Sequence, residues 1–203
     1  MKRVAIISLV LIFSGCTVPL FEKLSKKVDE DANAEVAELS QHEKAVIQAM
    51  FEYEAQGSKS GKPVIVLSSC SSADMLMDSL GGEEASDRID AATIRSFRKA
   101  NHRSHRWPTD LDSRYAIHLL SSQEMEKIWK DQEGWNRFYR TFPGAHGHIT
   151  LSRAGFSADG RTALIYRGCQ SDWLAGHGRL YLLRFERGRW KVTNEHIGGM
   201  WVS

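Results

Sequence analysis

Residues 148–203 constrain the fold more than any other stretch, because runs of β-forming residues alternate there with turn residues. Branched and aromatic side chains dominate four runs, which are residues 149–156, 162–167, 179–185 and 190–197. Asp159-Gly160, between the first two runs, supplies the positive φ angles of a tight hairpin. The pattern predicts an antiparallel four-strand meander, with the apolar segment 163–166 as a buried central strand.

The first of these runs changes its apolar parity along its length. Ile149 and Leu151 occupy odd positions, whereas Ala154 and Phe156 occupy even positions. Since successive side chains of a strand point to opposite faces, the two pairs share one face only if the strand is interrupted. We therefore expect a β-bulge between the pairs, near Arg153 and Gly155.

Helical patterns occupy the part of the chain before the meander. Apolar and aromatic residues recur at helical spacing in segments 36–57, 88–100, 121–129 and 135–142, and short apolar strands are expected at 64–67 and 115–120. Asp87 is a candidate cap for the second helix, and Ser121 with Glu124 forms a capping box for the third. Helices before strands favour an α+β fold, with N-terminal helices packed on one face of a mostly antiparallel sheet.

The N-terminus has the pattern of a lipoprotein signal peptide. Lys2 and Arg3 precede an apolar run, residues 4–13, that is too short to span a bilayer. The next step of the pattern is the sequence FSGC, which ends at Cys16 and resembles the lipobox of bacterial lipoproteins. That family usually has leucine where this chain has Phe13. The resemblance implies cleavage before Cys16 and acylation of that cysteine; the alternative is an ordinary cleaved signal peptide.

The lipobox resemblance divides the chain into a signal peptide at 1–15, a polar tether at 16–35 and a single α+β domain at 36–203. Several acyl chains, each contributing about 0.8 kcal/mol per buried methylene, would hold the protein on a membrane. Thr17 stands where enteric lipoproteins retained in the inner membrane have aspartate. We therefore expect a lipid-anchored protein of the bacterial cell envelope, located in the outer membrane.

The charge balance argues against a nucleic-acid partner. Lys2 and Arg3 account for the formal net charge of +2, so the chain after the signal peptide has equal numbers of acidic and basic side chains. Acidic residues gather early in the chain, and basic residues gather late. We interpret both groups as solvated faces, with a basic surface for a partner as the alternative.

Short motifs of aromatic, glycine and arginine residues mark the C-terminal third. They are GW at 134–135, FY at 138–139, FPG at 142–144, LSRAGF at 151–156, ALIY at 163–166, GRWKV at 188–192 and WVS at 201–203. Together they resemble the C-terminal region of a family of uncharacterised bacterial exported proteins. That family has no established activity, so the resemblance implies no catalytic residues. Its members often have two cysteines in the loop matching 168–178, where this chain has only Cys169.

Cys70 and Cys169 are the two cysteines left after the predicted acylation site. An oxidising envelope compartment favours a disulfide between them, and closing a loop of this size contributes up to about 4.7 kcal/mol in the chain-entropy model. The alternative is two buried, unreactive thiols. Cys70 lies among serines and outside any recognised nucleophile motif, so a catalytic role for it is not expected.

An antiparallel meander would gather polar residues at the end opposite its first turn. These residues are His146, His148, Cys169, Asp172, His177 and His196, with Trp173 and Trp201 beside them. Imidazole, carboxylate and thiolate groups bind transition metals, but their spacing here matches no metal motif, so we assign no metal and no other cofactor. Tryptophans are frequent at binding hot spots, which favours this end as the docking site for a partner or ligand. The alternative is a set of ordinary loop residues.

Three functions fit this sequence. The first is a non-enzymatic envelope lipoprotein that binds or supports another envelope component, since no nucleophile elbow, phosphate loop or metal motif is present. The second is an envelope hydrolase in which His148, His177 or His196 acts as general base or ligand and Asp172 orients it. The third is an inhibitor or immunity-type protein that inserts a loop into a partner's active site. The expected partners are the lipid bilayer, through acylated Cys16, and an envelope protein.

Overall fold

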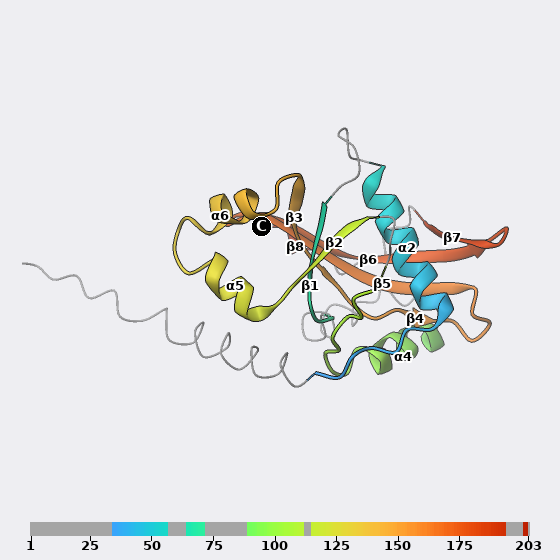
Figure 1. The fold of residues 1–203 in the computed structure, drawn as a ribbon. Helices are drawn as coiled ribbons and strands as arrows, with labels where there is room; N and C mark the ends of the chain where they lie inside the picture. Colours follow the sequence, from blue (N-terminus) through green and yellow to red (C-terminus); the bar gives the residue numbers. More distant parts are fainter. Residues whose placement is uncertain (1–33, 57–63, 72–88, 112–114, 194–200, 203) are drawn as a thin grey trace, which may run out of the picture.

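The computed structural model describes residues 34–56, 64–71, 89–111, 115–193 and 201–202, and its fold is mixed α+β (Figure 1). The helices are α2 (Gln41–Ala55), α4 (Ala91–Ala100), α5 (Ser122–Ile128) and α6 (Gly134–Thr141). The strands are β1 (Val64–Ser68), β2 (Ala116–Leu120), β3 (Ala145–Leu151), β4 (Gly155–Phe156), β5 (Thr162–Asp172), β6 (Ala175–Glu186), β7 (Arg189–Val192) and β8 (Trp201–Val202). None of these described helices is long and apolar enough to cross a membrane.

The strands form one mixed sheet, which corrects the expectation of a mostly antiparallel one. The order is β2-β1-β3-β5-β6-β7, with β4 paired to β5 and β8 paired to β6. β1 pairs in parallel with β2 and β3, whereas the pairs β3–β5, β5–β6 and β6–β7 are antiparallel. In sequence, α4 separates β1 from β2, and α5 and α6 separate β2 from β3. Such helical crossovers return the chain in the same direction, so each new strand adds in parallel.

β5 and β6 form a longer hairpin than the sequence predicted. We predicted a loop at 168–178, but both strands continue through this segment and pair Gly168 with Gly178. A Cβ atom added to Gly168 would lie 2.6 Å from Oγ1 of Thr150 on the neighbouring strand. The glycine therefore allows close packing inside a strand and does not mark a loop.

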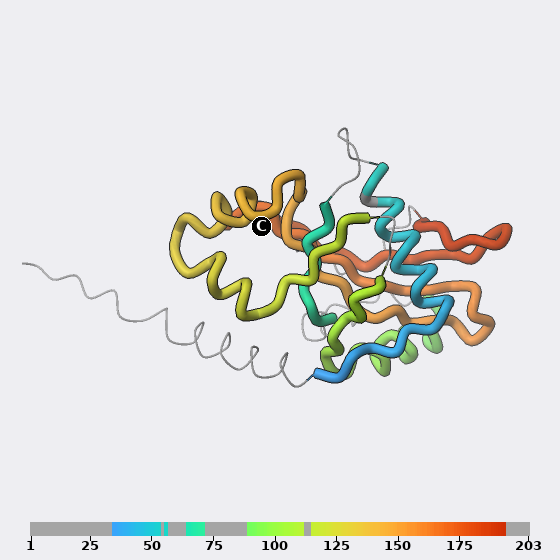
Figure 2. Tube along the Cα trace, viewed as in Figure 1, coloured from blue at the N-terminus to red at the C-terminus, as the bar shows by residue number. Residues whose placement is uncertain are grey.

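Helices cover both faces of the sheet, which corrects the expectation of helices on one face. Ile165 of β5 packs in one core cluster with Ile47 of α2, which we call the α2-side core, whereas Leu164 packs in another with Phe97 of α4. Neighbouring strand residues point to opposite faces, so α2 and α4 lie on opposite sides. Figures 1 and 2 show α2 crossing in front of the long strands and α4 below them. Segment 163–166 is at most 2% exposed, which confirms the predicted buried strand.

α5 and α6 enclose a third cluster against β1 and β2. Phe138 of α6 packs there with Val66 and Leu120. The predicted capping box is confirmed, because Oγ of Ser121 accepts from the backbone N of Glu124 at 3.3 Å and the backbone N of Ser121 donates to the Glu124 carboxylate at 2.9 Å. Desolvation raises the pKa of Glu124, but the hydrogen bonds from Ser121 lower it more, so this pKa lies below its ordinary value.

α2 and α4 each begin at a capping side chain that apolar spacing does not reveal. Oγ of Ser40 accepts from the backbone N of Glu43 at 3.1 Å, so α2 begins later than predicted. The carboxylate of Asp90 accepts from the backbone N of Thr93 at 2.9 Å and caps α4. The predicted cap of this helix, Asp87, lies outside the described residues. Hydrogen bonds from the Thr93 hydroxyl and backbone lower the pKa of Asp90.

The predicted bulge is confirmed between β3 and β4. Leu151 pairs with Arg167, and Gly155 pairs with Leu164. Between these two pairs the chain from β3 to β4 advances by four residues, whereas β5 advances by three. One extra residue on one strand is the definition of a β-bulge. The shift keeps Ala154 in the α2-side core together with Leu151.

Arg153, inside this bulge, joins both helices to the sheet. Its Nε and Nη2 donate to Oε1 and Oε2 of Glu43 on α2 at 2.6 and 2.7 Å. Asn101, directly after α4, accepts from the backbone N of Arg153 at 2.8 Å and donates to its backbone O at 3.0 Å. One residue of the sheet therefore connects helices that lie on opposite faces.

Candidate functional site

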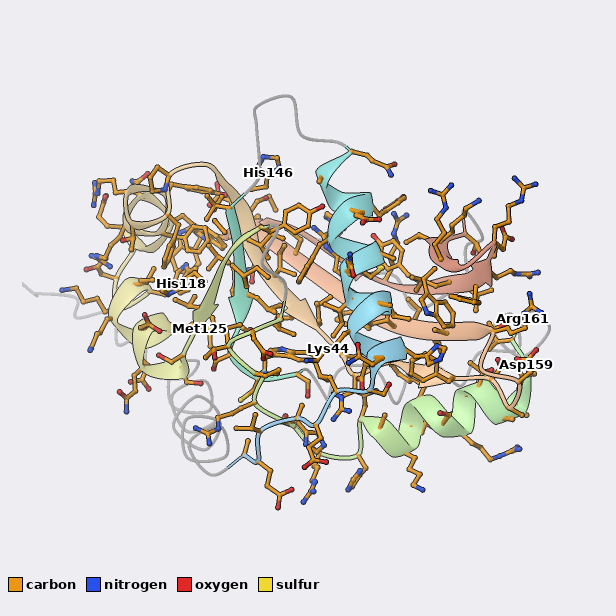
Figure 3. All side chains as sticks on the ribbon, turned by 45° about the vertical axis from the view of Figure 1, so that its right-hand side comes forward. Lys44, His118, Met125, His146, Asp159 and Arg161 are labelled. Carbon is orange, nitrogen blue, oxygen red and sulfur yellow. The ribbon has the colours of Figure 1, made fainter. Side chains whose placement is uncertain are left out.

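The two ends of the sheet expose different groups. At one end, hydrogen bonds close the turn between β4 and β5: the backbone N of Ser157 donates to O of Thr162 at 2.9 Å, and Asp159 accepts from the backbone N of Arg161 at 3.0 Å. Figure 3 shows Asp159 and Arg161 at this end, far from His146. The end near His146 contains the start of β3, where the predicted site residues begin.

The structure separates the histidines of the predicted site. His146 is exposed on β3, and His196 lies outside the described residues. His148 and His177 pair with two adjacent residues of β5, one from each neighbouring strand. Since adjacent residues of a strand point to opposite faces, the side chains of His148 and His177 lie on opposite faces of the sheet. The single predicted site is therefore two separate sites.

On the face covered by α5 and α6, His148 contacts a serine. Its Nε2 lies 2.9 Å from Oγ of Ser68, the last residue of β1. The imidazole also packs on the indole of Trp129, with 5.7 Å between ring centroids. A serine hydroxyl at this distance from an imidazole has the arrangement of a nucleophile and its general base. The predicted orienting group, Asp172, instead accepts a hydrogen bond from the backbone N of Trp173 at 2.7 Å.

On the face covered by α2, His177 belongs to a group that we call the basic cluster: Tyr53, Arg167, His177, Arg179 and Tyr181. Nη1 of Arg167 lies 2.7 Å from Nε2 of His177. Nη2 of Arg179 donates to the hydroxyl of Tyr53 at 3.3 Å. The guanidinium of Arg179 lies 4.5 Å from the ring centroid of Tyr181, a cation–π contact.

Partial desolvation and nearby positive charge act on the ionisation of His177. A guanidinium only donates hydrogen bonds, so Nε2 of His177 accepts from Arg167 and the ring is neutral. Desolvation, then the charges of Arg167 and Arg179, lower the pKa of His177. Arg167 is 5% exposed, whereas His177 is exposed. The basic cluster therefore extends from the surface to a buried guanidinium.

The tip of the β5–β6 hairpin exposes two adjacent apolar side chains. Trp173 is 50% exposed, and Leu174 is 85% exposed. The strand end below them is fixed to α6, because the hydroxyl of Tyr139 donates to the backbone O of Ser171 at 2.8 Å. An ordered support thus presents both apolar side chains to solvent.

The two cysteines are buried thiols, and the structure contains no disulfide between them. Cys169 packs in the α2-side core, and Cys70 lies shortly after β1. Cys16, the predicted lipidation site, lies outside the described residues. Within the described part of the chain, no three His, Cys, Asp or Glu side chains converge where a metal ion could bind.

Comparisons with known proteins assign no family to the chain. No protein-family model, curated protein or solved structure matches it. The resemblances to lipoprotein signal peptides and to the exported-protein family therefore stay predictions from the sequence.

Arg167 of the basic cluster and Ser68 were missed in the sequence. A signal for Arg167 was present, because it directly follows four apolar residues of a strand predicted to be buried. A charge at such a position costs free energy unless the fold gives it partners. Ser68 had a weaker signal, since its contact with His148 joins strands that are distant in the sequence.

Proposed function

We propose that this chain is a lipid-anchored protein of the bacterial cell envelope, held in the outer membrane through acylated Cys16. The domain acts as a non-enzymatic binding module for another envelope protein. The anchor is supported by the signal-peptide pattern at 1–15 and by the lipobox resemblance. The polar segment 16–35 serves as the tether that separates the domain from the lipid.

One observation carries the binding function, the exposure of Trp173 next to Leu174 at the hairpin tip. Leaving a large apolar side chain in water forgoes about 1.5–3 kcal/mol of burial. Tryptophan buries a large area with few rotatable bonds and is enriched at binding hot spots. A hairpin that is already ordered also avoids the entropic cost of fixing a loop on binding. The tip therefore suits an apolar pocket on a protein partner.

Capture of proteins from envelope extracts tests this function. The test variant combines Trp173→Ala with Leu174→Ser, and the control combines Asp159→Ala with Arg161→Ala at the opposite end of the sheet (Figure 3). All four side chains are exposed, so both variants should keep the melting temperature of the wild type within a few degrees. We expect only the tip variant to lose the captured protein. If only the control variant loses the captured protein, the docking surface lies at the end of Asp159 and Arg161, which contradicts docking at the tip. If the captured protein is an envelope hydrolase, its inhibition by the domain tests the inhibitor-type alternative.

A second function, hydrolysis by a serine nucleophile, is favoured by the 2.9 Å contact between Ser68 and His148. In this mechanism, His148 accepts the proton of Ser68 as the hydroxyl oxygen attacks a carbonyl carbon, and returns it to the leaving group as the bond between that carbon and the leaving group breaks. His148 then takes a proton from the water that releases the acyl group from Ser68. A fluorophosphonate probe, which reacts with activated serines, separates the two functions. Labelling that disappears in Ser68→Ala would establish a hydrolase, whereas an unlabelled wild type would leave the binding function.

A further inference from the structure

We propose that the basic cluster binds a small tetrahedral oxyanion, either free phosphate or the phosphoryl group of a membrane lipid. This site goes beyond the proposed binding function, because it lies on the face covered by α2 and does not include the hairpin tip. The cluster consists of Tyr53, Arg167, His177, Arg179 and Tyr181.

Two of its cations are direct cross-strand neighbours. Arg167 of β5 pairs in register with Arg179 of β6, and both side chains point to the same face. Like charges placed directly opposite each other on a sheet repel and destabilise the pairing. An anion bound by both guanidinium groups converts this repulsion into attraction. The pair therefore costs less free energy when the site is occupied.

Arg179 is held in position and keeps a donor for a ligand. Its Nη2 donates to the hydroxyl of Tyr53 on α2, and its face packs on the ring of Tyr181. Its buried Nε has no hydrogen-bond acceptor among the described residues. A buried donor without an acceptor is unfavourable, and an oxyanion supplies that acceptor.

His177 can take up a proton, and a bound anion would stabilise the resulting charge. On its face, its titratable neighbours are Cys169 and Arg167 on β5 and Arg179 on β6, with Tyr53 of α2 beyond Arg179. β8, which pairs beside His177, has no ionisable residue. A bound anion supplies the negative charge that favours protonated His177, so the affinity should rise as the pH falls.

The number of elements that supply donors favours a tetrahedral oxyanion over a carboxylate. A carboxylate pairs with a single guanidinium through two coplanar oxygens. Here the donors belong to three separate elements, β5, β6 and α2, and not to one guanidinium. Phosphate and sulfate offer more oxygens than a carboxylate to such a set of donors, and arginine is the residue best suited to them.

Calorimetric titration of the full chain with sodium sulfate is the first test, because the charge of sulfate does not change near neutral pH. We expect one site with a Kd of about 1 mM or tighter. Arg179→Gln should weaken the affinity about tenfold or more. The matched control is Arg184→Gln, an exposed arginine on the same strand, which should bind as the wild type does. His177→Gln should remove the rise in affinity between about pH 8 and about pH 6.

A second arm separates the two sources of the phosphoryl group. In the first experiment, inorganic phosphate replaces sulfate in the calorimetric titration. In the second, the Cys16→Ala chain and the same chain carrying Arg179→Gln are each cosedimented with phosphatidylglycerol vesicles. Vesicle binding that needs Arg179 assigns a lipid headgroup, whereas binding of the free anions alone assigns a soluble ligand. Arg167 stays unchanged, because its burial would mix effects on folding with effects on binding. The proposal is overturned if the folded wild type binds none of the three probes, or if Arg184→Gln loses as much affinity as Arg179→Gln.

Discussion

Replacing Glu43 by alanine should destabilise the fold far more than the loss of a surface ion pair. Glu43 is 4% exposed, and its carboxylate accepts from Nε and Nη2 of Arg153 and from the backbone N of Ala154. The side chain of Arg153 is only 14% exposed, so the variant leaves a largely buried guanidinium without its counter-charge. Removing one partner of such a pair costs about 3–5 kcal/mol. Domains of this size have total stabilities of about 5–15 kcal/mol, so the loss is a large fraction.

Urea unfolding followed by tryptophan fluorescence measures this free energy, and the melting temperature should fall by about 6–20 °C. The matched control is Glu35→Ala, which removes an arginine–glutamate pair at 2.7 Å whose side chains are 54% and 70% exposed. The control should cost less than about 1 kcal/mol. The double variant Glu43→Leu with Arg153→Met should cost much less than Glu43→Ala, because it leaves no buried charge. Equal losses for Glu43→Ala and Glu35→Ala would refute the role of Arg153 as the link between α2 and the sheet.

Three further predictions concern the core, the basic cluster and the anchor. Ile165→Ala should cost about 2–5 kcal/mol in urea unfolding, because Ile165 is fully buried, and a loss below about 0.5 kcal/mol would contradict its place in the core. The pKa of His177 is lowered in the fold, so the unfolded chain takes up its proton first and the stability of the wild type should fall as the pH drops below about 6.5. His177→Gln should flatten this decline, and parallel stability curves for the two proteins would exclude the effect. Radioactive fatty acid should label the wild type and not Cys16→Ala; equal labelling would rule out Cys16 as the acylation site.

The first turn of the C-terminal region was predictable because its signal is local. Asp159-Gly160 forms the expected turn, and Gly160 has a φ angle of 66°. The bulge was predictable as well, since the parity of Leu151 and Ala154 is visible in the sequence. The same holds for the capping box of α5, because both of its residues lie within one helical turn.

Strand direction and helix placement were not predictable, because they depend on contacts between distant segments. β1 and β3 are parallel neighbours, although α4, β2, α5 and α6 separate them in the sequence. The apolar run 163–166 indicated burial on both faces, but no local pattern told which helix covers which face. Packing of α2 on one side and α4 on the other decides this.

The sequence predicts one site that contains both His148 and His177, because Gly168 and Gly178 suggest a loop between the strands. Gly168 and Gly178 lie inside strands, so His177 is on a regular pleat and points away from His148. A loop would have allowed the two imidazoles to meet. Once the hairpin is known, the cross-strand pair of Arg167 and Arg179 follows directly from the register.

Photo-crosslinking in intact cells tests the proposed binding function most directly. A photoreactive phenylalanine analogue replaces Trp173 at the hairpin tip in one strain and Asp159 at the opposite end in another. We expect irradiation to give an adduct with one envelope protein from position 173 and no adduct from position 159. Adducts from position 159 alone, or none from either position while the domain remains folded, would contradict docking at the tip.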